Sequence, residues 1–589
     1  MERISIYQSL IKTFEQKKQK LRSKRLRLSL IRLIVFLTCL AGIYLFWSTT
    51  LLVVGFVFVF ILAFIVLVKM HAECNRELKK IKLLIEINQN EIKALDGNYN
   101  HFKNGVAYKN PEHAFAEDID LFGEKSFFQF INRTGLSQGE MLLANWLKSN
   151  DINNIKDKQN AIKELADHIE FRQNFTAEAK MLENQDELNA IVKALEQHQN
   201  FVPKSFRYLG LFFSGLSLAI IGLYAFSIIN TMQLLLWIFI GLGITGFYLK
   251  KINVLSHITS KAQELFRQYQ KLINAVELEH FDSELLKTKQ SQLSSKNQKA
   301  SEAIKSLSKH IDALEQRQNL MVGFVFNAFL LWDLQQSYKI EQWLNTHKND
   351  LKQWFDIMAF FDAQNALANL AYNQTTYTFP SIDHSSKLIL DCKSSTHPLI
   401  PTTQAVTNDF QVMNEDFLII TGANMAGKST FLRTVSLMIV MANLGLPVCA
   451  SHCNYKPIKL ITSMRTSDSL SDESSYFFSE LSRLKTIIEH LKTDTYFIVL
   501  DEILKGTNSH DKAKGSKQFI EKLVNTNSTG IIATHDLSLC ELSDQLKQVH
   551  NFYFDAEIIN DELHFDYKFK KGVCQNMNAS FLLKKMGIV

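Results

Sequence analysis

Two long stretches of this sequence contain no charged residue. Leu33–Val68 and Tyr208–Leu249 lack Asp, Glu, Lys and Arg altogether, although these types make up 21% of the chain. A helix needs about 20 apolar residues to cross a bilayer, so each stretch is long enough for two crossings and too long for one. Polar residues at Ser48–Thr50 and Asn230–Thr231 suit the intervening turns. We therefore predict two transmembrane helical hairpins. The alternative, a pair of buried core helices, is disfavoured because soluble helices usually show a polar face.

Basic residues flank both apolar stretches and predict their topology. The flanking lysines and arginines are Lys17, Lys18, Lys20, Arg22, Lys24, Arg25, Arg27, Arg32, Lys69, Arg76, Lys79 and Lys80 around the first stretch, and Lys204, Arg207, Lys250 and Lys251 around the second. Positive residues stay on the cytoplasmic side, so both hairpins are expected to enter and leave from there, as in a multi-pass protein of a bacterial inner membrane. The first stretch begins too late and runs too long for a cleaved signal peptide.

The chain has little net charge and few cysteines. Its charge of +6 comes largely from the basic N-terminal run, whose place beside a predicted span favours lipid anchoring over a nucleic-acid patch. Composition alone therefore gives no case for DNA binding. Seven scattered cysteines suit reduced thiols in a cytoplasm. Cys449, His452 and Cys453 lie close together, but no second ligand pair accompanies them, so ordinary buried thiols are favoured over a metal site.

The rest of the chain divides by its periodicity. The predicted segments are a basic cytoplasmic N-terminus (1–32), the first hairpin (33–68), a helical segment with a core (69–203), the second hairpin (208–249), a helical return (252–373) and an α/β domain (375–589). Met321–Trp332 is apolar but short, and Asp333 interrupts it, which favours a buried or interfacial helix over a fifth span. There are no internal repeats and no low-complexity linker.

The C-terminal segment changes in character. "YTFPSI", "KLILDC" and "DFLIITG" are rich in β-branched and aromatic residues, as strands are. Strands then alternate with helices up to about Thr534, which is the rhythm of a mainly parallel sheet. The expected fold class is thus a membrane-anchored helical region followed by an α/β domain.

A glycine-containing loop lies between a predicted strand and a predicted helix. "TGANMAGKSTF", residues 421–431, fits the G-x-x-x-x-G-K-[ST] pattern, in which backbone N–H groups and a helix N-terminus hold phosphates. Lys428 is expected to bridge the β- and γ-phosphates of ATP, and the Ser429 hydroxyl to bind Mg²⁺. The candidate ATP-binding residues of this loop are Gly422, Asn424, Met425, Gly427, Lys428, Ser429 and Thr430.

Acidic residues at the end of a second apolar strand complete this candidate site. "TYFIVLDEI" ends in Asp501, expected to hold Mg²⁺, and Glu502, placed to polarise the attacking water as general base. Surface charge at a strand end is the plainer interpretation of such a pair, but the phosphate loop favours catalysis. A third strand, "TGIIATHD", ends in His535, whose imidazole would contact the γ-phosphate.

Taken together, these motifs resemble the ATPase core of the MutS mismatch-repair family, a branch of the ABC-type P-loop ATPases. The resemblance implies a homodimer with each ATP between two subunits, and non-specific, salt-dependent contacts to DNA phosphates. It covers about Glu112–Phe201 and Trp343–Val589. The quoted segments that carry it are "TGANMAGKSTFLR", "VLDEILKGTNSHD", "ATHD", "STHPLI" (Ser395–Ile400), Asn408–Asp409, Phe127–Leu147 and "FDYKFKKGV".

The sequence also departs from the family pattern. In "DSLSDESSYFFSEL", Ser475 stands where the family's serine reaches the γ-phosphate of the partner subunit, but Glu473 replaces a glycine and Tyr476 a threonine. An acidic side chain near a γ-phosphate is unfavourable, so closure is expected to be weaker or differently shaped.

The family's mismatch reader, with its Phe-x-Glu wedge, has no counterpart before the core. Phe115–Glu117 and Phe122–Glu124 match its three letters by chance. The second hairpin lies where the family's lever helices lead to a DNA clamp, so we expect these levers to lead to the bilayer. The expected function is a membrane-anchored, dimeric ATPase that binds DNA. The alternatives are a nucleotide-switched tether for protein partners and, less favoured, a transporter ATPase, because no intramembrane charge marks a substrate path.

Overall fold

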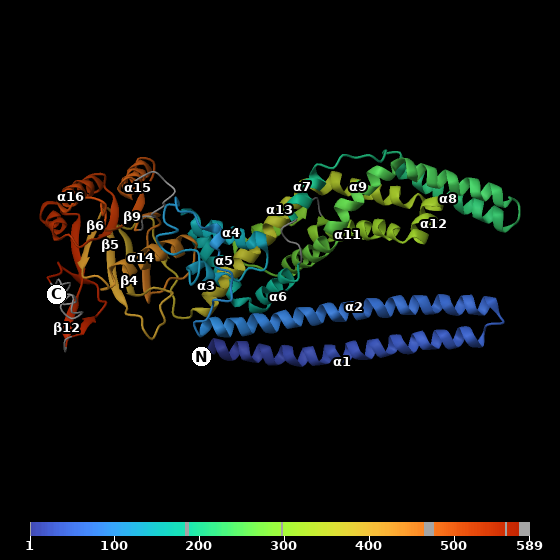
Figure 1. Ribbon diagram of the computed structural model, residues 1–589, viewed down its shortest axis with the longest axis horizontal. Helices are drawn as coiled ribbons and strands as arrows, with labels where there is room; N and C mark the ends of the chain where they lie inside the picture. Colours follow the sequence, from blue (N-terminus) through green and yellow to red (C-terminus); the bar gives the residue numbers. More distant parts are fainter. Residues whose placement is uncertain (1, 183–187, 296–297, 465–475, 560–561, 576–589) are drawn as a thin grey trace.

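The computed structural model describes residues 2–182, 188–295, 298–464, 476–559 and 562–575. The molecule is elongated, with an α/β domain at one end and two helical hairpins reaching the other (Figure 1). Helices hold 63% of the residues that the structure describes. The predicted combination of a long helical region with a C-terminal α/β domain is therefore confirmed.

The first hairpin consists of two unusually long helices. Helix α1 (Glu2–Leu45) and helix α2 (Thr50–Leu95) lie side by side, and the chain reverses between them. Each carries an apolar window long enough to cross a membrane. At the opposite, polar end, the buried Tyr7 hydroxyl donates a hydrogen bond of 2.7 Å to the Asn373 side chain. Further along α2, Arg76 and Lys80 pair with Glu178 of α6 (Ile169–Lys180), so the polar half of the hairpin is held to the body of the protein.

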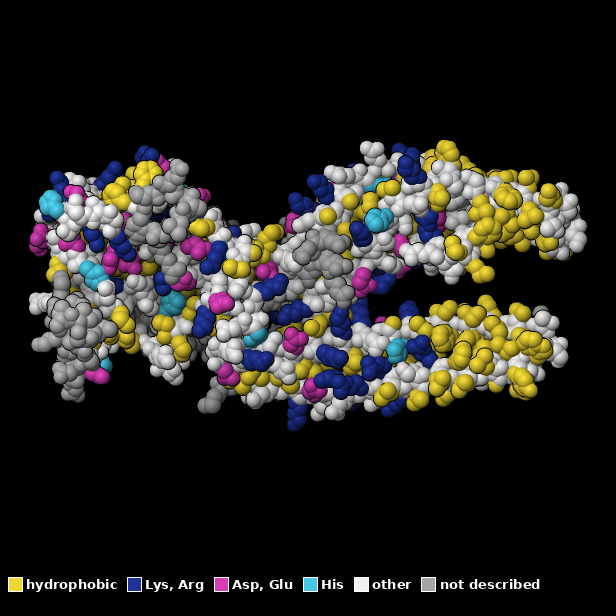
Figure 2. Space-filling view, in the orientation of Figure 1, with side chains coloured by type: hydrophobic (Ala, Val, Ile, Leu, Met, Phe, Trp, Pro, Cys, Tyr) yellow, Lys and Arg dark blue, Asp and Glu magenta, His cyan; other side chains and the backbone are white. Residues whose placement is uncertain are grey.

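The second hairpin consists of α8 (Phe206–Ala225) and α9 (Thr231–Leu278), which also contain apolar windows of spanning length. Asn230 begins α9 with a capping box, in which its side chain accepts from the Gln233 N–H and the Gln233 side chain accepts from the Asn230 N–H. Figure 2 shows hydrophobic side chains gathered on the surface at the same end of both hairpins, with Lys and Arg nearer the body.

The remaining helices form the body between the hairpins and the α/β domain. They are α3 (Phe127–Ile131), α4 (Ser137–Lys148), α5 (Ile155–Asp167), α6 (Ile169–Lys180), α7 (Leu188–Glu196), α10 (Glu284–Ser291), α11 (Ala300–Glu315), α12 (Leu320–Leu330) and α13 (Trp332–Asn373). The short antiparallel strands β1 (Ser294–Ser295) and β2 (Gln298–Lys299) precede α11. The longest of these helices, α13, runs from the second hairpin to the α/β domain (Figure 1).

The α/β domain contains a six-stranded sheet in the order β14-β11-β6-β10-β9-β8, parallel except for β14. A four-stranded sheet, β3-β7-β4-β5, and a two-stranded β12-β13 sheet lie beside it. The strands are β3 (Ser381–Ile382), β4 (Leu388–Ser395), β5 (Asn408–Met413), β6 (Phe417–Gly422), β7 (His452–Tyr455), β8 (Lys459–Ser463), β9 (Tyr496–Asp501), β10 (Thr529–Ala533), β11 (Val549–Phe554), β12 (Ala556–Ile559), β13 (Glu562–Phe565) and β14 (Lys570–Lys571). Its helices are α14 (Lys428–Asn443), α15 (Tyr476–Leu491), α16 (Ser509–Asn525) and α17 (Leu542–Gln545).

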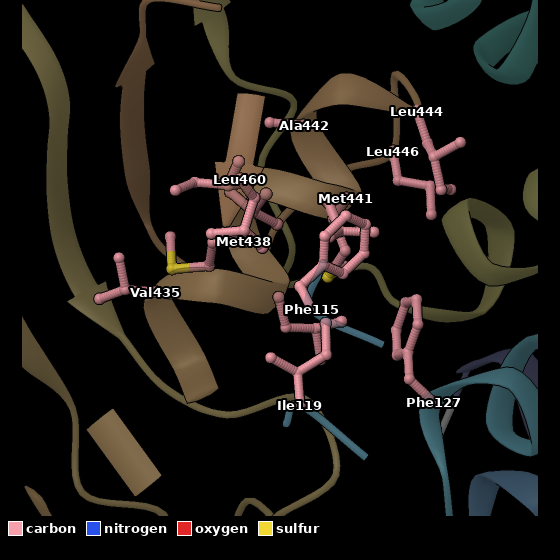
Figure 3. Packing of buried hydrophobic residues seen from close by; sticks show 14 of the residues in the cluster. Phe115, Ile119, Phe127, Val435, Met438, Met441, Ala442, Leu444, Leu446 and Leu460 are labelled. Atoms are coloured by element: carbon pink, nitrogen blue, oxygen red, sulfur yellow. The ribbon is translucent and has the colours of Figure 1, made fainter. Parts of the chain in front are cut away.

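The α/β domain shares a hydrophobic core with the segment that follows the first hairpin. In Figure 3, Phe115 lies next to Met441 of α14, and Ile119, Phe127 and Met438 lie around this pair. All five side chains are buried in one cluster, which also contains residues of β6, β9 and β10. Burial of a large apolar side chain contributes about 1.5–3 kcal/mol, so this contact holds the domain and the body together.

A buried carboxyl group positions the body against α13. Both oxygens of Asp362 accept hydrogen bonds from the backbone N–H groups of Gly135 and Leu136, at 2.7–3.0 Å. Burial raises the pKa of Asp362 to about 7, although these N–H groups and Lys180 act in the opposite direction. The carboxyl therefore fixes the start of α4 at an electrostatic cost that depends on pH.

We expect Asp362→Asn to flatten the pH dependence of stability. A carboxyl whose folded pKa lies near 7, against about 3.9 in the unfolded chain, favours the folded state at low pH. That advantage is lost as pH rises from about 4 to 7, at no more than about 1.4 kcal/mol per pH unit. Melting temperatures of the detergent-solubilised wild type should therefore fall more between pH 5 and 7 than those of the variant. Equal slopes would contradict this account of Asp362.

Candidate functional site

The glycine-containing loop connects the central strand β6 to helix α14. Gly422 has φ of +145°, and a Cβ there would lie 2.5 Å from the Phe554 carbonyl oxygen. Gly427 has φ of +106° and directly precedes Lys428, the first residue of α14. Side chains disfavour both backbone conformations, so glycine is required to fold the loop around the helix N-terminus. The result is a set of N–H groups and a helix dipole suited to an anion.

Lys428 turns its amine back over this loop. Its Nζ donates hydrogen bonds to the carbonyl oxygens of Gly422 (2.7 Å) and Ala423 (3.0 Å). The side chain is buried, and this burial lowers the pKa of Lys428, while Glu502 and Asp501 act in the opposite direction. A cation that is poorly solvated and held by neutral carbonyls is well placed to bind a phosphate.

Ser429 and Asp501 meet at the carboxyl edge of the sheet. The Ser429 hydroxyl donates to Asp501 Oδ2 at 2.7 Å. Asp501 ends β9 opposite Ala533, the last residue of β10, which brings the ends of the two strands to one edge. Burial raises the pKa of Asp501, and the Ser429 hydrogen bond opposes this. A hydroxyl and a carboxylate at this spacing are oxygen ligands of the kind Mg²⁺ prefers, so the residues fit the ion.

Glu502 and His535 form a contact in the same place. His535 Nε2 donates to Glu502 Oε1 at 2.8 Å and also lies 3.2 Å from Lys428 Nζ. The hydrogen bond from His535 lowers the pKa of Glu502 to about 2, so this carboxylate is ionised at neutral pH. Glu502 itself has φ of +50°, an uncommon conformation for a residue with a side chain. The Glu502 N–H donates to the Ala533 carbonyl at 2.9 Å, which holds this residue beside the end of β10, two residues before His535.

One cavity of about 730 Å³ is lined by Lys428, Ser429, Asp501 and Glu502. Asn424, Met425, Gly427 and Thr430 also line it, so the structure brings the predicted loop residues together with Asp501 and Glu502. Gly422 and His535 adjoin this wall through their contacts with Lys428. The chemical roles assigned to these residues stay predictions.

Part of the cavity wall was not predicted from the sequence. His397, Asn408 and Tyr567 line it, although Tyr567 lies far from both others in the chain. The Asn408 side chain joins these segments, because it donates to the Tyr567 carbonyl at 3.0 Å and accepts from the Phe569 N–H at 2.8 Å. Burial lowers the pKa of His397 to about 4. In the sequence, the pairs His397–Pro398 and Asn408–Asp409 were the signals that could have predicted this wall.

Two further expectations meet different outcomes. Ser475 and Glu473 lie outside the described residues, and the described part of the signature segment begins with Tyr476 at the start of α15. Of the two cysteines near His452, Cys453 is buried beside Cys392, with 3.3 Å between the two sulfur atoms, whereas Cys449 is partly exposed. No cluster of three or more metal-ligating side chains occurs among the residues that the structure describes.

The C-terminal part of the chain is similar in sequence to known proteins. Residues 418–584 match the family model of MutS domain V. The DNA mismatch repair protein MutS of Methanococcoides burtonii is 30% identical over 252 residues, which cover 41% of this chain and 28% of that protein. MutS of Finegoldia magna is 32% identical over 232 residues, which cover 38% of this chain and 26% of that protein. The matches to these two relatives therefore span little more than a quarter of each of them. The range matched by the family model includes the loop, β9 and β10 of the candidate site. The C-terminal part of this chain is therefore similar to domain V of the MutS family.

Proposed function

We propose that this chain is a membrane-anchored, MutS-like P-loop ATPase that hydrolyses ATP between two subunits. One observation carries the proposal: the loop lysine, the Ser429–Asp501 pair and the Glu502–His535 pair converge on one cavity at the carboxyl edge of a parallel sheet. Ligands of open α/β sheets bind at this edge. The arrangement supplies cations, N–H donors and carboxylates where a Mg²⁺-nucleotide needs them.

Each group has a distinct part in this proposal. The loop N–H groups and Lys428 bind the phosphates, and Lys428 exchanges its carbonyl partners for phosphate oxygens. Ser429 and Asp501 hold Mg²⁺, which neutralises charge on the phosphates. Glu502 is ionised and polarises the attacking water once its contact with His535 loosens. His535 then faces the γ-phosphate. Ser475 of the partner subunit completes the site in the dimer.

Membrane anchoring is supported by the two hairpins. In the described part of the chain, four helices have apolar windows of spanning length, and no more than 17% of any window is buried. The apolar surfaces lie at the same end of the molecule, so one bilayer accommodates both hairpins (Figure 2). Their basic flanks favour the α/β domain on the cytoplasmic side. In water, these surfaces would be a strong aggregation hazard.

DNA is the proposed partner because the relatives are DNA mismatch repair proteins. The second candidate is a nucleotide-switched tether for other proteins. It is favoured by one feature: the long helices that leave the body lead into the apolar hairpin α8–α9. Both candidates use the same ATP site, so they differ in the partner and not in the chemistry.

We expect Glu502→Gln to abolish ATP hydrolysis while leaving ATP binding in place. The amide keeps the size of the side chain but cannot accept a proton from water, a change that typically costs about 10²–10⁴-fold in rate. The measurement is the ATPase rate of the detergent-solubilised protein, together with binding of a fluorescent ATP analogue.

Glu541→Gln is the matched control for this variant. Glu541 is exposed in the same domain and lies outside the cavity. The ATPase rate of Glu541→Gln should therefore equal that of the wild type. Loss of activity in Glu541→Gln, or full activity in Glu502→Gln, would contradict the assignment of Glu502.

Duplex DNA should stimulate the ATPase if DNA is the partner. The rates without DNA, with matched duplex and with mismatched duplex are compared at several salt concentrations. Stimulation through phosphate contacts must fall as salt rises, because binding releases counterions. An ATPase rate that does not change when DNA is added, but still requires Glu502, would leave the ATPase assignment intact and favour the tether.

A further inference from the structure

Helix α12 has an exposed apolar surface beside the second hairpin. Its sequence, LMVGFVFNAFL, contains no charge. Leu320 is 87% exposed, Met321 82%, Phe324 53% and Val325 48%. Neighbouring residues on α8 and α9, such as Phe212 and Leu236, are exposed in the same way. An apolar surface of this extent is unusual for a helix that faces water.

The contacts of α12 place it at the depth of the predicted membrane spans. A Cβ on Gly241 of α9 would lie 2.2 Å from the Ala328 carbonyl oxygen, so the two helices touch there. Gly241 precedes Leu249, the end of the charge-free stretch, by eight residues, or about 12 Å along a helix. The end of α12 therefore lies well inside the apolar part of the hairpin.

The helices on either side of α12 enter and leave this depth from the same side. At the end of α11, the Glu315 carboxylate accepts from Ser256 Oγ at 3.0 Å, beyond the charge-free stretch. After α12, the Gln335 amide lies 3.1 Å from Ser214 Oγ and 3.3 Å from the Gly210 carbonyl oxygen, inside the stretch. Further along α13, Glu341 accepts from the Phe201 N–H at 2.8 Å, before the stretch begins. Between the end of α11 and the middle of α13, the chain therefore reaches the level of the predicted spans and returns to the side from which it came.

Polar side chains near the end of α12 and at the start of α13 turn towards the protein. Asp333 is buried and pairs with Arg317 at 3.1 Å. Trp332 Nε1 donates to the Ala313 carbonyl at 2.8 Å, and Asn327 accepts from the Asp333 N–H at 3.0 Å. Within a bilayer, ionisable groups pair with one another and face the protein interior. The outward surface of α12 is left purely apolar.

We propose that α12 is a re-entrant membrane segment whose exposed face contacts lipid acyl chains in the leaflet nearest the α/β domain. With 11 residues it is about 16 Å long, half of what is needed to cross the hydrocarbon region. Re-entrant backbone is stable at this depth where protein covers it, and α8, α9 and α13 pack against α12. The proposal rests on the membrane anchoring of α8–α9 proposed above. Helix α13 begins at Trp332, just after the end of α12, so this placement attaches α13 to the bilayer.

Spin labels on single cysteines test this placement. Full-length protein is reconstituted into vesicles of phosphatidylethanolamine and phosphatidylglycerol, with a nitroxide at Val325 or, as a second position, Met321. The reference positions are Phe239 on the α8–α9 hairpin and Leu278 at the polar end of α9, which are 68% and 70% exposed. Collision rates with oxygen, which concentrates in lipid, and with a water-soluble nickel chelate are measured for each label.

We expect the ratio of oxygen to nickel collisions at Val325 and Met321 to be several-fold higher than at Leu278 and to approach that at Phe239. Values like those of Leu278, with Phe239 in lipid, would overturn the re-entrant placement and leave the membrane anchoring intact. Labels on α12 that neither reagent reaches would also overturn it, because they would indicate a protein partner on this face. Water exposure at Phe239 would overturn the anchoring itself.

Discussion

The structure depends on the burial of one long helix, α13, in two hydrophobic cores. Near its C-terminal end, Ala366 and Leu367 belong to the core that includes the β-strands of the candidate ATP site. Further towards its start, Leu344 and Trp354 belong to the core of the helical region beside the second hairpin. Close-packed interiors transmit displacement, so a helix shared by two cores links movements at one end to those at the other. The buried Asp362 carboxyl adds a directional contact to the segment before α4.

The candidate ATP site is already assembled within one subunit. Lys428 is held by loop carbonyls, Ser429 by Asp501, and Glu502 by His535. Each of these groups thus has a partner within the protein. If ATP binds as proposed, it would replace these protein partners in a site whose side chains are already close together. The proposed contribution of a second subunit adds to this site and does not create it.

Local patterns in the sequence predicted local structure well. The loop between β6 and α14 and the acidic end of β9 follow from short motifs, and the turn at Asn230 follows from one polar break in an apolar stretch. By contrast, "YTFPSI" forms a strand only at Ser381–Ile382. The pairing of Asp362 with Gly135 and the cavity wall at Tyr567 join residues hundreds of positions apart or from separate elements. Such contacts depend on how helices and sheets pack, which periodicity does not encode.

The central claim is that an ATP-hydrolysing domain and a membrane anchor reside in the same chain. It is tested most directly by measuring ATPase activity in membranes that express the protein, after washing with alkaline carbonate to remove peripheral proteins. The account predicts that activity stays in the washed membranes, and that it is absent from membranes carrying Glu502→Gln at equal protein levels. Activity that washes into the supernatant, or that persists in the Glu502→Gln membranes, would contradict it.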